Sequence, residues 1–366
     1  MERMIDDSLD CLSSTVQMNI AITDEDLVPL LNSPLSDESL LKLGEALTIG
    51  PDQVERDAKD SIRRVLKAVH ERSGCPIDRF SVSGSCGHQS DNANDKMGFD
   101  ITVFVDCKAS HGQLESMECS IQSAEKIYHA LRPIVTESES NHFGMHFKLD
   151  GYNYHVAVTP SMGKKMHLQR KAVWDLIEKK DREGSLSQPD LDILSISLHE
   201  SLTSFMHMGD PVFHDMIRLG RLWRQWALLE QGCGELPTLA VVMVMMRCIE
   251  DEKARGMSVA LGETKFPLMR VFKDFLNMLA DLDNLTISFQ RFYEPDMVPE
   301  RHQGGTKPTI LDPVNPWRNV VHNMTHEGIW WVKRHASECM KILESKLSTV
   351  GDLFMIPPKL GRARGV

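Results

Sequence analysis

The sequence lacks several features that mark common classes of protein. Its eight cysteines form no C-x-x-C pair and no His-Cys cluster with zinc-ligand spacing, which excludes the usual zinc and dithiol motifs. We therefore expect reduced, largely buried thiols in a protein of the cytoplasm or the nucleus. The longest apolar run, near 239–246, is much shorter than the about 20 residues that span a membrane. The acidic N-terminus does not resemble a signal peptide, and no membrane partner is expected.

The sequence does contain enough apolar residues for a large core. It has 366 residues, of which 42% are hydrophobic, and a formal net charge of −11. The net charge excludes a surface that is basic throughout, although a polyanion requires only one basic face. The chain has two basic clusters, the first at Lys164, Lys165, His167, Arg170 and Lys171 and the second at Arg218, Arg221 and Arg224. For the first cluster, a solvated helix face and a binding surface are equally supported, whereas for Arg218 and Arg221 of the second cluster we favour binding.

The pattern of apolar residues divides the chain into four segments. Residues 1–50 are acidic and contain a helical stretch that Ser36 is placed to cap, which indicates a brace or an arm for a protein partner. Residues 51–185 predict a long helix and a mixed sheet with strands near 80–84, 99–106, 143–149 and 152–158. Residues 186–348 predict amphipathic helices, and 349–366 form a tail. The predicted fold class is α+β, with a sheet lobe, a helical C-terminal lobe and a cleft between them.

The most informative segment is 80–106. Gly84 and Ser85 follow a β-type run, where a glycine permits a tight turn and the amide and hydroxyl groups suit a phosphate. The next β-type run carries Asp100, and the residue two positions earlier on the same strand face is Gly98. Carboxylates at such positions hold Mg²⁺ together with substrate phosphates. Transfer by two metal ions normally requires three carboxylates, and these strand positions supply one, because Asp91 and Asp95 lie in the loop before the strand and Asp106 lies at its other end.

The segment 151–162 is expected to form the antiparallel strand beside Asp100. Its residues alternate between two faces, and a third carboxylate would belong on the face of His155 and Ala157. No carboxylate is present there. A neutral imidazole at His155 is a poor ligand for Mg²⁺, so the neighbouring strand does not complete a metal site.

Beyond these motifs, the chain resembles the oligoadenylate synthetases and the related immune nucleotidyltransferases that make cyclic dinucleotides. The resemblance runs from about 52 to 345. It is carried by the strings FDITVFV, HVAVTP, MIRLGRLWRQW, ELPTLAVVMVMMRCIE and, most specifically, TILDPVNPWRNV at 309–320. The resemblance implies a two-lobed nucleotidyltransferase fold, transfer chemistry that uses ATP and Mg²⁺, and double-stranded RNA as a partner.

The resemblance also implies roles for individual residues. It makes Asp100 the one retained catalytic and metal carboxylate, because Gly98 and Ala157 occupy the other two positions. The base-site pair of the family is replaced by Thr238 and Leu239, and its RNA-gripping residues fall near Thr203 and His207. The residues that it assigns to nucleotide binding are retained: Gly84, Ser85, Arg218 and Arg221.

The favoured hypothesis is a catalytically impaired member of this family that retains nucleotide or RNA binding in the innate antiviral response. Two alternatives stay open. The first is an active 2′-5′-oligoadenylate synthetase that depends on double-stranded RNA and uses ATP and Mg²⁺. The second is a protein-interaction scaffold that binds neither ligand. The sequence does not decide whether the protein is an enzyme.

Overall fold

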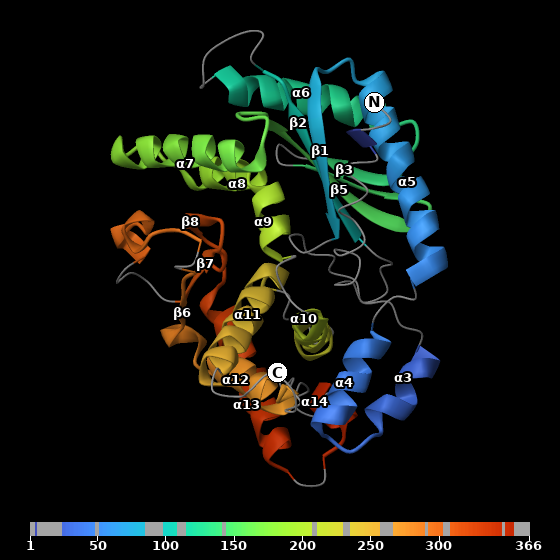
Figure 1. The fold of residues 1–366 in the computed structure, drawn as a ribbon, viewed down its shortest axis with the longest axis vertical. Helices are drawn as coiled ribbons and strands as arrows, with labels where there is room; N and C mark the ends of the chain where they lie inside the picture. The colour runs from blue at the N-terminus through green and yellow to red at the C-terminus, as the bar shows by residue number, and fades with distance from the viewer. Residues whose placement is uncertain are drawn as a thin grey trace, which may run out of the picture.

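The computed structural model shows a sheet at one end of the molecule and a group of helices at the other (Figure 1). The structure describes residues 4–5, 24–47, 51–84, 98–107, 115–140, 144–206, 211–229, 235–256, 266–289, 292–302, 308–345 and 348–354.

The five-stranded mixed sheet has the spatial order β1-β2-β5-β4-β3. β2 pairs antiparallel with β1 and parallel with β5, and β4 pairs antiparallel with both β5 and β3. The β4–β5 hairpin turns at Asp150 and Gly151, which both have positive φ, as the Asp-Gly pair predicts. The strands are β1 (Ile77–Gly84), β2 (Gly98–Val105), β3 (Thr136–Ser140), β4 (Met145–Leu149) and β5 (Tyr152–Pro160).

The prediction of an antiparallel strand beside Asp100 was wrong, because β5 runs parallel to β2. The helix α6 (Glu115–Leu131) connects β2 to β3, as parallel strands require a long crossover. The two hairpins that follow reverse the chain twice, which returns β5 to the direction of β2. Strand β3 is absent from the prediction because its five residues are all exposed and show no apolar alternation.

One face of the sheet is apolar and the other is polar. Phe99, Ile101 and Val103 of β2 lie in a core that also contains residues of α5 (Pro51–Arg72) and α6. Because side chains alternate along a strand, Asp100 and Thr102 point to the opposite face. Both are buried, so other parts of the chain cover that face.

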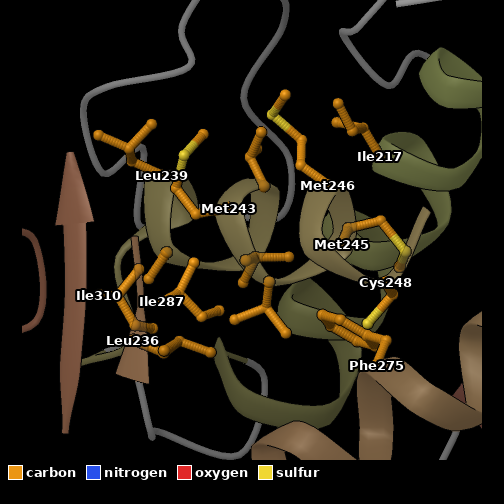
Figure 2. Close-up of a cluster of buried hydrophobic side chains, with 14 of the residues drawn as sticks. Ile217, Leu236, Leu239, Met243, Met245, Met246, Cys248, Phe275, Ile287 and Ile310 are labelled. Atoms are coloured by element: carbon orange, nitrogen blue, oxygen red, sulfur yellow. The ribbon is translucent and has the colours of Figure 1, made fainter. Parts of the chain in front are cut away.

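The second group of elements is mainly helical and has its own continuous core. Figure 2 shows Met245 of α11 near Ile217 of α10 and Phe275 of α12, all fully buried. The helices are α7 (Met166–Arg182), α8 (Gln188–Ile196), α9 (His199–Met206), α10 (Pro211–Trp223), α11 (Thr238–Gly256), α12 (Leu268–Ala280), α13 (His326–Glu344) and α14 (Val350–Phe354). A π-helix, Arg224–Leu229, extends α10, and a small sheet contains β6 (Thr286–Ile287), β7 (Thr309–Asp312) and β8 (Asn315–Asn319).

Two N-terminal helices, α3 (Asp24–Leu31) and α4 (Asp37–Ala46), pack on this helical group (Figure 1). Ser36 caps α4 by accepting a hydrogen bond from the Ser39 amide at 3.1 Å, which confirms the predicted cap. Leu40 and Leu43 of α4 are fully buried in the core that contains α10. The face of α10 toward α4 is therefore covered by the N-terminal segment.

The structure corrects the expectation that all cysteines are reduced. Cys107, after β2, and Cys119, in α6, form a disulfide with their Cα atoms 6.2 Å apart. Their spacing in the sequence matches no motif, because only the packing of α6 beside the end of β2 brings them together. Within the described ranges, no helix is long and apolar enough to cross a membrane.

Candidate functional site

The polar face of the sheet is the candidate site. In the parallel register of β2 and β5, Asp100 lies beside His155 and Thr102 lies beside Ala157. On the other side, β1 places Ser81 beside Thr102. The strand position next to Asp100 is therefore occupied by an imidazole, and the position next to Thr102 by a methyl group.

Asp100 is paired with a histidine. Nδ1 of His155 lies 3.3 Å from Oδ1 of Asp100, and both side chains are buried. His146 of β4 stacks on His155 with 4.4 Å between ring centroids and 25° between ring planes. Burial lowers the pKa of His146, and the neighbouring His155 lowers it further, against the opposing effect of Asp100. A stack of two imidazoles thus lies against the carboxylate.

The start of α9 brings a third histidine to this face. His199 Nδ1 and Thr102 Oγ1 share a hydrogen bond of 2.7 Å. Burial lowers the pKa of His199, although Asp100 acts to raise it. The next residue, Glu200, accepts two hydrogen bonds from Arg79 of β1, from Nε at 2.7 Å and from Nη2 at 2.9 Å. This bidentate pair fixes the start of α9 against the sheet.

The described side chains on this face do not fit a two-magnesium site, and Asp91 and Asp95 lie outside the described residues. Mg²⁺ binds oxygen ligands in a nearly octahedral arrangement, and a two-metal site requires carboxylates that complete both shells. Gly98 has no side-chain oxygen, Ala157 has none, and His155 offers nitrogen. Among the described residues, no group of three or more His, Cys, Asp or Glu could hold a metal ion. The face therefore presents a buried carboxylate, Asp100, with imidazoles beside it.

The glycine motif lies at the end of β1 near this network. Gly84 pairs with Phe99, the residue before Asp100, and Gly98 opens β2 beside Asn153. Gly84 and Gly98 therefore lie at the same end of the β1–β2 strand pair as Asp100. Ser85, which the resemblance assigns to the phosphate, is outside the described residues, as is His207.

Arg218 has its contacts on the side of α10 that faces α4. It is buried, forms an ion pair with Asp215, and donates from Nε to the Gly44 carbonyl at 3.0 Å. Burial lowers the pKa of Arg218, and Asp215 opposes that shift. Arg221, one turn later, is only half-buried. The assignment of Arg218 and Arg221 to nucleotide binding stays a prediction, and in this arrangement the Arg218 guanidinium is engaged within the protein.

The sequence interpretation missed His146 and His199 as neighbours of Asp100. For His146 a signal was present: a two-residue turn at Asp150-Gly151 fixes the hairpin register, and this register pairs His146 with His155. For His199 no local signal exists, because α9 reaches the sheet only through tertiary packing.

Comparisons with known proteins address the fold. No protein-family model matches the chain, and no curated protein matches its sequence. The structure of mtPAP in complex with UTP is 12% identical, covers 92% of this chain and 76% of that chain, and has a TM-score of 0.55.

Two further structures have similar coverage. Cid1 poly(U) polymerase with Mg and 3′-dATP bound is 12% identical, covers 84% of this chain and 94% of that chain, and has a TM-score of 0.51. CdnC of E. coli MS115-1 with ATP is 13% identical, covers 88% of this chain and 92% of that chain, and has a TM-score of 0.49. Identities this low concern the fold alone. The chain has the α+β nucleotidyltransferase fold that its sequence predicts.

Proposed function

We propose that this chain is an oligoadenylate-synthetase-like protein that has lost two-metal nucleotidyl transfer and acts by binding nucleotide or RNA in the innate antiviral response. The observation that carries the proposal is the surroundings of Asp100. The strand neighbour of this carboxylate is the imidazole of His155, while Gly98 and Ala157 supply no side-chain oxygen.

The energetic consequence is large. Each metal ion contributes several kcal/mol of charge stabilisation to the transition state, and each 1.36 kcal/mol corresponds to about a tenfold change in rate. A single carboxylate beside an imidazole also has too little negative charge to hold two divalent cations. The proposal therefore separates binding of ATP, which phosphate contacts can support, from transfer, which the metal ions would have to support.

The first prediction is that the protein forms no 2′-5′-linked oligomers when it is incubated with Mg²⁺, ATP and double-stranded RNA. The physical reason is the missing metal site, and chromatography of the products measures it. Asp100→Asn is the matched control, and its product level should equal that of the wild type. Oligomers that form in the wild type and disappear in Asp100→Asn would establish the active synthetase in place of our proposal.

The scaffold alternative has one observation in its favour, namely that the Arg218 guanidinium is buried with Asp215 and the Gly44 carbonyl. A scaffold would show no heat of ATP binding in calorimetry and no RNA shift in a gel. Binding of either ligand would exclude it.

A further inference from the structure

The first two turns of α7 and the residues just before them form a basic face. Figure 1 shows α7 at the edge of the molecule, beside α8. The basic face consists of Lys164, Lys165, His167, Arg170 and Lys171, all exposed except for the half-buried Arg170. Within the part of the chain that the structure describes, none of the five forms an ion pair. The second half of α7 differs, because Lys180 pairs with Asp190 at 2.8 Å and Arg182 with Glu178 at 3.7 Å.

Basic side chains share one side of the helix with an aromatic ring. Residues three, four and seven apart lie on the same helix face, which places His167, Arg170, Lys171 and Trp174 in one stripe. The Arg170 guanidinium carbon lies 5.2 Å from the centroid of the Trp174 ring. A planar guanidinium held against an indole keeps its donors oriented and loses little entropy when it binds a phosphate.

The basic face has a rigid base. The buried Gln169 side chain accepts hydrogen bonds from the amides of Met162 at 2.7 Å and Gly163 at 3.0 Å, and donates to the Pro160 carbonyl at 3.1 Å. Trp174 Nε1 donates to the Val314 carbonyl at 2.8 Å. Because these bonds fix the segment before any ligand arrives, binding would require little ordering of the backbone.

The positive charge of the basic face is unfavourable without an anion. Lysines beside one another repel, and the start of α7 adds to this because a helix N-terminus is itself positive. Lys165 at the N-cap makes no side-chain capping bond, and the first turn has no acidic residue. An anion would offset both effects, and among the described residues no carboxylate lies within ion-pair distance of these five side chains.

The distribution of apolar side chains distinguishes RNA from a membrane. Met166 and Leu168 are 37% and 47% exposed, but residues two apart on a helix point to nearly opposite sides. A helix that binds a membrane needs one continuous apolar face, which these two side chains do not form. We propose that the basic face binds the phosphate backbone of RNA. The choice of RNA as the class of ligand rests on the proposed function.

The test compares two triple variants of the full chain, each of which removes three lysine charges. Lys164→Ala/Lys165→Ala/Lys171→Ala should weaken binding of labelled double-stranded and single-stranded RNA about tenfold or more at about 0.15 M salt, and should make the slope of log K against log salt shallower by about two. The matched control is Lys42→Ala/Lys67→Ala/Lys273→Ala, because these half-exposed lysines each have an acidic partner elsewhere. The control should bind RNA like the wild type in fluorescence anisotropy.

Three outcomes would overturn this inference. The two triple variants could bind RNA with equal affinity, or the wild type could bind no RNA. In the third outcome, the Lys164→Ala/Lys165→Ala/Lys171→Ala variant loses binding to phosphatidylserine vesicles while its RNA binding is unchanged. The last would assign the face to lipid headgroups. ATP calorimetry and the oligomer assay report on the Asp100 face instead. Oligomer synthesis by the wild type would contradict the proposed function and leave the basic face as an RNA site.

Discussion

Replacing Arg218 by methionine is expected to lower the free energy of unfolding by about 3–5 kcal/mol, because removing one partner of a buried ion pair leaves the other charge uncompensated. The guanidinium is buried beside Asp215 and donates to the Gly44 carbonyl of α4. Methionine keeps much of the length and apolar volume of arginine, so the loss reports mainly on charge. Urea denaturation followed by circular dichroism near neutral pH measures it.

Two controls separate this structural role from nucleotide binding. Arg221→Met, one turn later at a half-buried position, should cost about 1 kcal/mol or less. Arg218→Met/Asp215→Asn should recover much of the stability, because the uncompensated carboxylate is gone. If Arg218→Met were as stable as the wild type and failed to bind ATP, the guanidinium would have the triphosphate role that the family resemblance implies.

The elements of the sheet could largely be predicted from the sequence, because apolar alternation identifies β1, β2, β4 and β5 and the Asp-Gly pair identifies one hairpin. The direction of β5 relative to β2 could not. Alternation with a period of two is the same in a parallel and an antiparallel strand, so the pattern specifies a face and not a direction. Strand β3 has no buried side chain to reveal it.

The residue types of the candidate site could be predicted from the sequence, but their neighbours in space could not. The sequence places Asp100 on a polar face and shows that Gly98 and Ala157 have no carboxylates. It could not show that His155 is the strand neighbour of Asp100, since that register depends on the crossover through α6.

Arg218 and Arg221 illustrate a second limit of sequence reasoning. Residues three apart share a helix face, so the sequence favours one role for both. The structure buries Arg218 and leaves Arg221 half-buried, because α4, more than 170 residues earlier, covers that part of α10. Helical periodicity contains no information about which distant segment will cover a face.

Gly144→Ala is expected to destabilise the protein by about 2–3 kcal/mol through overpacking. Gly144 precedes β4 and lies against the His155 ring, and a Cβ there would lie 2.1 Å from Nε2 and 2.7 Å from Cδ2. The ring cannot easily move away, because it is paired with Asp100 and stacked on His146. Backbone strain makes no contribution, since Gly144 is not among the glycines with positive φ. Thermal and urea denaturation measure the loss.

A double-mutant cycle tests whether His155 is the cause. When Gly144→Ala is added to His155→Ala, the further loss should be less than about 0.5 kcal/mol, because the atoms that clash are absent. Gly184→Ala is the control for backbone conformation: it has φ +65° and nothing within 4 Å of the added Cβ, and should cost about 1 kcal/mol from its left-handed backbone alone. If Gly144→Ala cost as much without the imidazole as with it, His155 would not be held against Asp100. The close contact of the His155 imidazole with Asp100, which the proposed function uses to describe the surroundings of this carboxylate, would then be contradicted.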